Sequence, residues 1–411
     1  MRLKVANAAG RPTLGITLLL ASLSMVSPLS TDTFLPSFPT IAAEFNLTRW
    51  EVQQIITAYM LPFAFFALVH GPLSDALGRR RVVIGGLVAY TIGSIGCFVA
   101  PTFGTLLACR VLQGMAAGIG PSVSRAVVRD LFEGAAAQKL MSSMVMVFSL
   151  APAIAPVIGG WVHVALGWRW VFGMLVVLGA GLLLACALLF PETHPPSKRS
   201  HFHPVSLFKS AWNVAMGPAF SLLAFSAALA MSSLFIYIGA APVIILERWH
   251  LAETQFHYLF IPIVLGLMSA SFASGRIAGR VARPTQLRIG FGILYVSAAI
   301  VAVAHLFVPQ LPIFCMQLFL FALASGAQLV YPVLTLEMID MHPLARGAAA
   351  SVQTFVALGV GAVAMGMIAP TLHGDLALMA WISLGGSVLA WLFWRAGTAL
   401  RRREPADPAT V

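Results

Sequence analysis

Gly71-Pro-Leu-Ser-Asp-Ala-Leu-Gly-Arg79 and Gly275-Arg-Ile-Ala-Gly-Arg-Val-Ala-Arg283 carry one pattern twice, and this repetition decides the fold. The two stretches start 204 residues apart (275 minus 71), and they match at the first glycine and at the last arginine. The acid Asp75 of the first copy is Gly279 in the second. Each copy separates two long apolar runs, so we interpret the chain as two diverged halves, an organisation typical of membrane transporters with a site at midplane.

Apolar runs of about twenty residues, the length of a transmembrane helix, recur along all 411 residues. Hydrophobic residues make up 59% of the chain and charged residues 9%, with a mean hydropathy of +0.90. Soluble domains carry about 25% charged residues, so the composition excludes an ordinary soluble globule. We expect an all-α membrane protein with twelve transmembrane helices in two six-helix pseudo-repeat bundles. The spans lie near 14–38, 52–72, 82–100, 104–127, 140–163, 168–190, 214–243, 255–274, 287–306, 312–335, 348–371 and 376–394.

The longest polar interruption divides the twelve runs six and six. It begins at Pro191, and its prolines and charges are typical of a linker. We therefore predict a first bundle over 1–190, a cytoplasmic linker over 191–212, a second bundle over 213–396 and a cytoplasmic tail over 397–411.

The distribution of the basic residues behind the net charge of +11 indicates the membrane topology. With twelve spans, 21 of the 25 basic residues fall on the side of the two termini. The opposite side has only Arg49, Arg169 and Arg248, and Arg110 falls inside a span. By the positive-inside rule, both termini are cytoplasmic. The excess charge favours contact with anionic lipid over nucleic acid as a partner.

Asp32 is a lone carboxylate late in the first apolar run. A charge at bilayer depth costs about 2.5–3.5 kcal/mol or more, so we interpret Asp32 as a proton carrier. Arg110 in span four lies, like Asp32, about six residues or about 9 Å from the outer end of its span. The two residues are therefore expected to share a depth and to be able to pair. The alternative is a permanent salt bridge that only holds spans one and four together.

The stretch from Gly71 to Arg80 is expected to form a short cytoplasmic loop. Gly71 and Gly78 would permit close backbone approach and a tight turn. Arg79 and Arg80 would lie at the headgroups, with Asp75 and Asp130 as acids able to pair with them. We predict an ion-pair latch between Asp130 and this basic cluster that opens and closes with conformation. The alternative is a static basic loop, because exposed pairs contribute only about 0–1 kcal/mol.

Span five carries two adjacent stripes of small residues and prolines. The first stripe is Ala151, Ala155 and Gly159, a spacing that lets another helix approach closely. The second is Pro152, Pro156 and Gly160, whose prolines remove backbone donors and kink the span. We expect a hinge or seal between the halves, with an ordinary packed helix as the alternative.

Four stretches between residues 30 and 160 resemble the major facilitator superfamily. Two later ones, Ala241-Pro-Val-Ile-Ile-Leu-Glu247 and Arg346-Gly-Ala-Ala-Ala-Ser-Val-Gln353, resemble its Bcr/CflA group, so the resemblance extends over nearly the whole chain. The stretch from Gly71 to Arg80 is similar to its G-x-L-x-D-x-x-G-R-R signature, and Arg110-Val-Leu-Gln-Gly114 is similar to its R-x-x-Q-G. Ala151 to Gly160 resembles the antiporter pattern G-P-x-x-G-G, with Ala155 in place of a glycine. Ser30-Thr-Asp-Thr-Phe-Leu-Pro36 resembles the S-T-D-x-Y-L-P of the Bcr/CflA drug:proton antiporters. The resemblance implies the major facilitator fold and a central cavity along spans one and four.

Polar and aromatic residues within other spans are candidates for the substrate cavity. They are Tyr59, Gln113, Phe235, Gln328 and Tyr331. His70 is a second titratable candidate inside the membrane. The four cysteines form no C-x-x-C pair and no metal-ligand spacing is present, so we expect no metal and no disulfide. No cofactor is expected besides protons as the coupling ion, and no phosphate-binding or catalytic motif indicates an ATPase or another enzyme.

The predicted function is proton-coupled efflux of small drug-like compounds or antibiotics across the bacterial inner membrane, by one chain acting as a monomer. Two alternatives stay open. One is a dedicated metabolite exporter or symporter of the same fold, and the other is a membrane sensor or scaffold that transports nothing.

Overall fold

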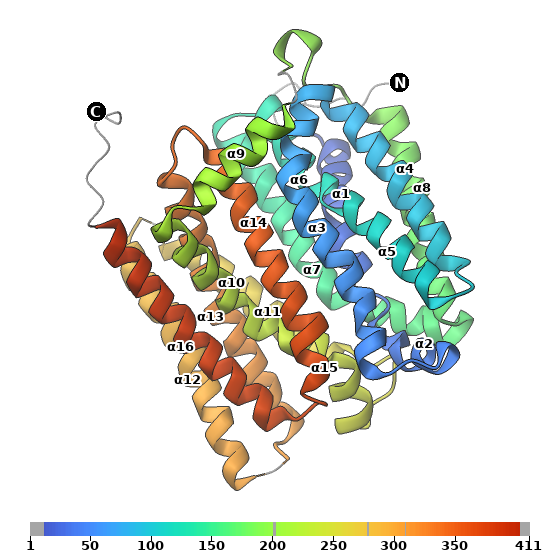
Figure 1. The fold of residues 1–411 in the computed structure, drawn as a ribbon, viewed down its shortest axis with the longest axis vertical. Helices are drawn as coiled ribbons and strands as arrows, with labels where there is room; N and C mark the ends of the chain where they lie inside the picture. Colours follow the sequence, from blue (N-terminus) through green and yellow to red (C-terminus); the bar gives the residue numbers. More distant parts are fainter. Residues whose placement is uncertain (1–11, 200–202, 278, 309, 403–411) are drawn as a thin grey trace.

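The computed structural model describes residues 12–199, 203–277, 279–308 and 310–402, and these residues are almost entirely helical (Figure 1). Twelve helical segments in them are long and apolar enough to cross a membrane. The predicted all-α architecture with twelve spans is therefore confirmed. The basic residues Arg2, Lys4, Arg11 and Arg403, and most of the predicted tail, lie outside the described residues.

The first half contains six spans from eight α-helices. Its elements are α1 (Leu14–Asp32), the 3-10 turn η1 (Leu35–Ser37), α2 (Phe38–Phe45), α3 (Arg49–Leu77), α4 (Arg79–Phe98), α5 (Phe103–Ala117), α6 (Ile119–Leu131), α7 (Gly134–Leu166) and α8 (Trp168–Leu189). The first span continues through η1 and α2 to Phe45, seven residues beyond the predicted end at residue 38. The fourth is divided at Gly118, where a side chain would collide with the ring of His70.

The linker and the second half contain the other six spans. Their elements are the 3-10 turn η2 (Pro196–Lys198), α9 (Pro204–Ala215), α10 (Pro218–Gly239), the π-helix η3 (Val243–Arg248), α11 (His257–Ile277), α12 (Arg283–Phe307), α13 (Ile313–Asp340), α14 (Arg346–Val363), the π-helix η4 (Ala364–Ile368), α15 (Ala369–Thr371) and α16 (Leu376–Arg401). The span near 348–371 thus contains a π-helical segment, where a widened turn leaves backbone groups free for other partners.

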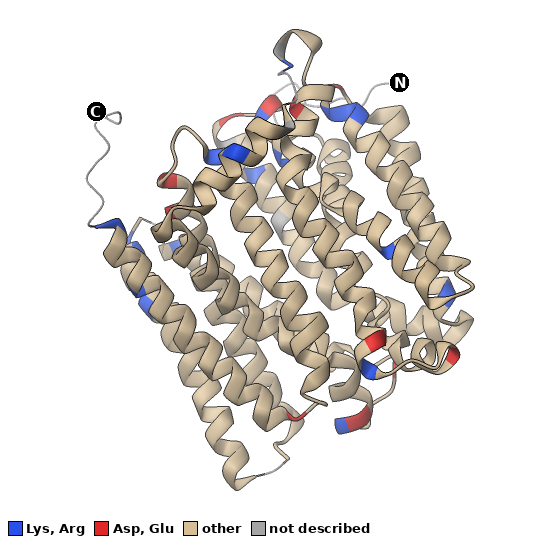
Figure 2. Cartoon of the chain, in the orientation of Figure 1, with Lys and Arg blue, Asp and Glu red and all other residues tan. Residues whose placement is uncertain are grey.

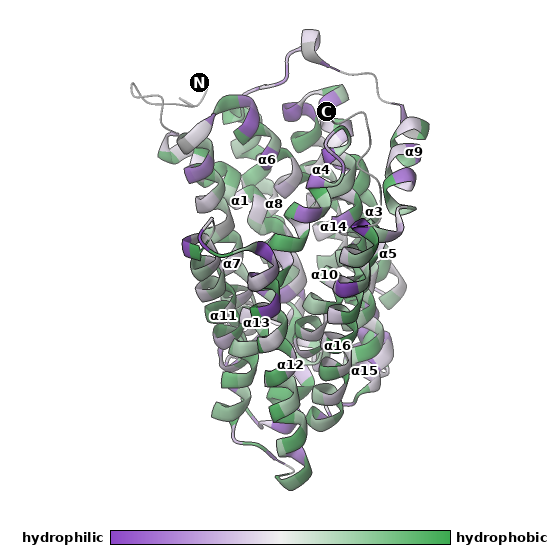
Figure 3. Ribbon diagram, turned by 90° about the vertical axis from the view of Figure 1, so that its left-hand side faces the viewer, coloured by the Kyte–Doolittle hydropathy of each residue, from purple (hydrophilic) through white to green (hydrophobic). Residues whose placement is uncertain are grey.

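The two halves lie side by side, with α3 packed on α14 and α7 packed on α11 across the junction (Figure 1). The start of α1 and the end of α16 lie toward one end of the bundle, here called the termini end, and α2 and α15 lie at the opposite, distal end. Figure 2 shows Lys and Arg gathered mostly at the termini end. The sides of the bundle are predominantly hydrophobic in Figure 3, as contact with lipid tails requires.

An ion pair recurs at equivalent places in the two halves. The Arg79 guanidinium at the start of α4 lies 3.1 Å from the carboxylate of Asp130 at the end of α6. The Arg283 guanidinium at the start of α12 lies 2.8 Å from the carboxylate of Asp340 at the end of α13. Each pair joins the third span of its half to the fourth, which supports the interpretation of the chain as a repeat.

Candidate functional site

Asp32 is the last residue of α1, and only 6% of its surface is exposed. The hydroxyls of its neighbours donate hydrogen bonds to backbone carbonyls of the preceding turn, Ser30 to Val26 and Thr33 to Leu29. Such back-bonding bends the end of a transmembrane helix without leaving polar groups unpaired. Among the described residues, no basic side chain lies within ion-pair distance of Asp32. The site therefore contains a buried carboxyl group outside any salt bridge.

Arg110 lies fully buried on α5 and binds oxygen atoms of three other residues. Its Nε donates to the Ile55 carbonyl at 3.2 Å, and its Nη1 donates to the Ser30 carbonyl at 3.1 Å and to Gln113 Oε1 at 2.9 Å. The bond to Ser30 places the guanidinium beside the end of α1, although the first span continues past Asp32 to Phe45. The expected direct pair with Asp32 is absent from the described ion pairs, because backbone carbonyls take its place.

Aromatic rings cover both sides of the guanidinium. The Arg110 carbon Cζ lies 4.3 Å from the ring centroid of Tyr59 and 4.6 Å from that of Phe34. Cation–π contacts of this kind contribute about 2 kcal/mol when desolvated. The Nη2 atom has no hydrogen-bond partner among the described atoms. The cage thus stabilises the cation and leaves the two N–H groups of Nη2 unused.

Two of the five predicted cavity residues belong to this buried cage. Tyr59 donates from its hydroxyl to the Ser27 carbonyl, and Gln113 donates to the hydroxyl of Ser94. Both side chains are fully buried. In this conformation their polar atoms are bonded within the first half, Tyr59 to Ser27 and Gln113 to Arg110 and Ser94. Their place on the wall of a substrate cavity stays a prediction.

The other three predicted cavity residues lie apart from the cage and from one another. Gln328 on α13 donates to the Ser271 hydroxyl on α11, within the second half. Phe235 on α10 packs against Gly361 of α14. Tyr331 on α13 lies near enough to Arg125 of α6 for an electrostatic interaction across the junction of the halves. Arg125 is an exposed cation within span four, one of the 21 basic residues that the sequence assigns to the side of the termini.

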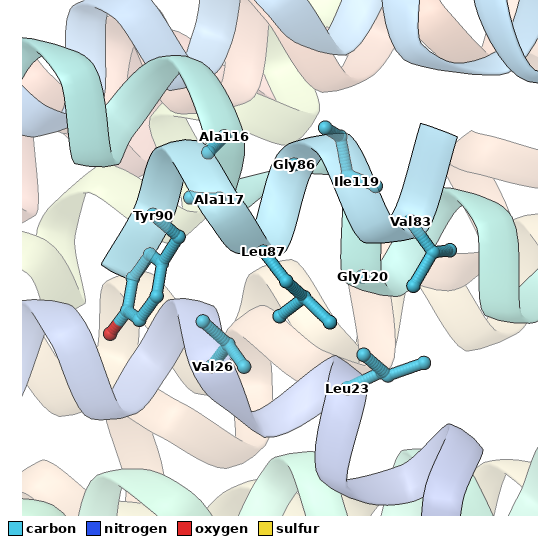
Figure 4. Close-up of a pocket in the computed structure, with 10 residues that line it drawn as sticks. All are labelled: Leu23, Val26, Val83, Gly86, Leu87, Tyr90, Ala116, Ala117, Ile119 and Gly120. Atoms are coloured by element: carbon cyan, nitrogen blue, oxygen red, sulfur yellow. The ribbon is translucent and has the colours of Figure 1, made fainter. Parts of the chain in front are cut away.

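A small apolar void lies inside the first half, between α1, α4 and the break at Gly118 (Figure 4). Tyr90 closes one end of it, and Leu23, Val26 and Leu87 are among its lining residues. Its volume of about 10 Å³ is that of one water at most. Drug-sized ligands need pockets of about 300–1,000 Å³, so this void is no substrate site.

Arg79 is the centre of a cluster of acids at the termini end. Its side chain is 6% exposed and forms ion pairs with Asp75 and Asp130. It also donates a hydrogen bond of 2.6 Å to the Ser74 hydroxyl. The linker joins the cluster, because Glu192 accepts from the Arg79 backbone N–H at 3.0 Å. The structure therefore brings together the residues of the predicted latch.

The stretch that contains them is not the expected loop. Residues 71–77 form the last turns of α3, and α4 begins at Arg79, so Gly78 alone connects the two helices. Gly78 has φ +96°, a conformation that favours glycine. Nothing lies within 4 Å of the place a Gly71 side chain would occupy, so the predicted close approach at Gly71 is wrong. Arg80 donates to the Ala187 carbonyl of α8 at 2.6 Å.

The two stripes of span five face different neighbours. Ala151 and Ala155 are fully buried, and the Cα of Gly159 faces the Thr33 carbonyl so closely that no side chain fits. Gly160 of the second stripe likewise faces the Glu253 carbonyl of the other half. Pro152 and Pro156 lie inside a continuous α7. The first stripe thus packs on α1, and the second includes a contact at the junction of the halves.

Hydrogen bonds from two adjacent glutamines close the distal end of the junction, a feature the sequence analysis missed. Gln53 donates from its amide to the Gly239 carbonyl at 2.9 Å and to the Met365 carbonyl at 2.7 Å. Gln54 donates to the Gly366 carbonyl at 3.2 Å. Two acceptors lie in the π-helix η4, whose widened turn makes them available.

One ion pair and one contact between a histidine and a carboxylate lie beside these bonds. Arg49 and Glu247 are 2.7 Å apart, and His163 Nε2 and Glu253 are 3.3 Å apart. All five described interactions join the first half to the second, and all lie at the distal end. The described conformation is therefore closed at its distal end.

Other candidate groups have ordinary environments. His70 is buried, and its Nε2 lies 2.9 Å from the Met115 carbonyl. The four cysteines are unpaired. Within the described residues, no three His, Cys, Asp or Glu side chains gather as a metal site would require.

Comparison with known proteins matches most of the chain to one family. The model of the Major Facilitator Superfamily matches residues 20–365. A bicyclomycin resistance protein homolog of Haemophilus influenzae is 28% identical over 92% of this chain and 95% of its own length. A chloramphenicol resistance protein of Pseudomonas aeruginosa is 28% identical over 74% of this chain and 72% of its own. The crystal structure of the human organic anion transporter MFSD10 has the same fold, with a TM-score of 0.69 at 18% identity over 93% of this chain and 99% of its own.

Proposed function

The chain belongs to the Major Facilitator Superfamily, and from that premise we propose that it exports small, largely apolar drug-like compounds in exchange for protons. The relatives named for bicyclomycin and chloramphenicol resistance support this substrate class. The basic residues gathered at the termini end support an orientation with that end in the cytoplasm of a bacterial cell.

The observation that carries the proposal is the buried carboxyl group of Asp32 beside an arginine that does not neutralise it. An isolated carboxylate in such a place costs several kcal/mol, whereas the protonated acid does not. The described conformation, closed at the distal end, is in this proposal the state in which Asp32 carries its proton. Arg110 is then held by the carbonyls of Ile55 and Ser30.

Loss of the proton changes the balance of charges. The new carboxylate attracts the guanidinium, whose Nη2 still has a donor to offer. Compound entering from the cytoplasm takes the place of the proton, and the halves rock to open the distal end. There the compound leaves and Asp32 Oδ takes a proton from outside. Asp32 is thus neutral in the proton-bound half of the cycle and negatively charged in the compound-bound half, and coupling depends on the carboxyl group gaining and losing one proton per cycle.

The test is dye or antibiotic efflux from proteoliposomes under an imposed pH gradient, with the wild type beside Asp32→Asn. We expect gradient-driven efflux in the wild type and none in the variant. Asp375→Asn is the matched control. Asp375 caps α16 at the distal end through a bond from the Leu378 N–H, and asparagine caps a helix equally well. An Asp32→Asn protein with full coupled efflux would refute the assignment.

A further inference from the structure

The linker helix α9 has three faces of different character. Leu207, Ala211 and Val214 lie toward the bundle, where the helix packs on α14 and α3. A second face, adjacent to the first, exposes large apolar side chains at spacings of three and four residues. They are Val205, Phe208, Trp212 and Met216, with exposed fractions of 81%, 43%, 64% and 59%.

The third face of α9 is polar and borders a hollow. Ser206, Lys209, Ser210 and Asn213 line one side of it, and His342 and Ala345 line the other. The volume of the hollow is about 400 Å³. It lies between the linker and the connection from α13 to α14, at the termini end of the second half.

The charge of this hollow is positive. Lys209 is the one Lys, Arg, Asp or Glu side chain among its lining residues, and it forms no ion pair within the described residues. The nearest acid in sequence to the α13–α14 connection is Asp340, and Arg283 already binds its carboxylate. Serine hydroxyls, an asparagine amide and a lysine ammonium suit the oxygens of a phosphate ester.

Apolar side chains also border the hollow on the loop side. Leu344, which precedes the lining residue Ala345, is 96% exposed. An amphipathic helix with a large exposed apolar face and a cationic polar face is typical of the membrane interface. Tryptophan, here Trp212, is enriched at the same depth.

We propose that α9 and the α13–α14 connection form a binding site for an anionic phospholipid of the cytoplasmic leaflet. The phosphate occupies the hollow beside Lys209, and the acyl chains cover the face of Phe208 and Trp212. The ring of Phe208 lies 5.9 Å from that of Phe65 on α3, so α9 touches both halves where they meet. A lipid bound there lies against α9, which must shift when the two halves rock. The assignment of the leaflet rests on the proposed orientation, whereas the binding itself does not rest on transport.

The first experiment measures lipid retention by native mass spectrometry on the full-length protein in detergent. Phosphatidylglycerol and phosphatidylcholine with identical acyl chains are compared for the wild type, Lys209→Gln and Lys139→Gln. Lys139 is an exposed lysine on α7 outside the hollow, so its variant is the matched control. One lysine near an anionic surface is worth about 1 kcal/mol, so Lys209→Gln should bind phosphatidylglycerol about fivefold more weakly. The control should bind it like the wild type.

Three results would overturn the proposal. One is equal retention of the two lipids by the wild type, and another is unchanged affinity in Lys209→Gln. The third is binding of glycerol phosphate as tight as that of phosphatidylglycerol, which would assign the hollow to a free phosphate ester. None of these measurements depends on efflux, so they separate this site from the proposed proton coupling.

A second experiment tests the position of α9 with brominated phosphatidylglycerol, which quenches nearby tryptophan fluorescence. Trp212→Phe should remove part of the quenchable signal. A quenchable fraction that is the same in wild type and Trp212→Phe would refute the interfacial position.

Discussion

The side-chain amide of Gln53 donates a hydrogen bond of 2.7 Å to the main-chain carbonyl of Met365, across the junction of the two halves. The donor lies near the start of α3 and the acceptor lies in the π-helix η4. The same amide also binds the Gly239 carbonyl, so one side chain satisfies two backbone groups that are otherwise buried at the contact. We expect this glutamine to set the stability of the distally closed conformation.

Gln53→Leu should therefore favour the distally open conformation. Leaving buried acceptors without a donor costs about 1–3 kcal/mol, which shifts a two-state equilibrium about 5- to 150-fold. The measurement is the distance distribution between spin labels across the distal end. Gln317→Leu is the control, because Gln317 binds the Tyr258 carbonyl within the second half. A distance distribution that responds equally to both variants would contradict this role.

Arg110→Lys should abolish coupled efflux although it keeps the charge. A lysine offers one ammonium group where the guanidinium makes three directed bonds and stacks on two rings. We expect at least a tenfold loss of gradient-driven transport in proteoliposomes. Arg169→Lys is the control, since Arg169 also stacks on a ring and pairs with Glu44, but at an exposed place. Normal coupling in Arg110→Lys would mean that the charge alone suffices.

Asp130→Asn should weaken the cluster around Arg79 more than Asp340→Asn weakens the equivalent pair of the second half. The Arg79 side chain is 6% exposed, whereas those of Arg283 and Asp340 are 50% and 44% exposed. We expect a loss of about 1–3 kcal/mol for Asp130→Asn and less than about 1 kcal/mol for Asp340→Asn. Thermal unfolding in detergent measures both. Equal effects would show that burial does not distinguish the two pairs.

Gly159→Ala should destabilise the first half, because its methyl group would collide with the Thr33 carbonyl one residue after Asp32. Overpacking of this kind costs about 1–3 kcal/mol. Gly181→Ala on α8 has open space around it and should be neutral or slightly stabilising. Unfolding midpoints of the two variants, with efflux activity for Gly159→Ala, test the contact. A Gly159→Ala protein as stable as Gly181→Ala would show that α1 and α7 separate easily.

Much of the fold can be predicted from the sequence, because the lengths of the apolar runs and the positions of the charged residues are visible in the chain itself. Twelve apolar runs suffice to predict twelve spans, and the shared pattern at Arg79 and Arg283 predicts the repeat. Helix rise predicts a shared depth for Asp32 and Arg110 only if the first span ends near residue 38. The span continues to Phe45, so Asp32 lies 13 residues from its end (45 minus 32) and Arg110 lies seven from the start of its span at Phe103 (110 minus 103).

The partners of Arg110 and Gln53 could not be predicted in the same way. Their acceptors are backbone carbonyls of Ile55, Ser30, Gly239 and Met365, and every residue carries such a group. Nor does the sequence indicate which way Gln328 faces. Lipid tails and neighbouring helices are both apolar, so residue hydrophobicity does not distinguish the lipid-facing side of a span from the side that packs on other helices. Packing in three dimensions decides both questions.

The bonds that close the distal end leave the two halves with unequal freedom to evolve. In the glutamine hydrogen bonds the first half contributes the side-chain amides of Gln53 and Gln54, whereas the second contributes main-chain oxygens of Gly239, Met365 and Gly366. Side chains of the second half take part only in the neighbouring contacts of Glu247 and Glu253. Substitutions at the side chain of Met365 can therefore accumulate without loss of the acceptor. A lineage could retune which compounds it expels through the second half and inherit the closing mechanism unchanged.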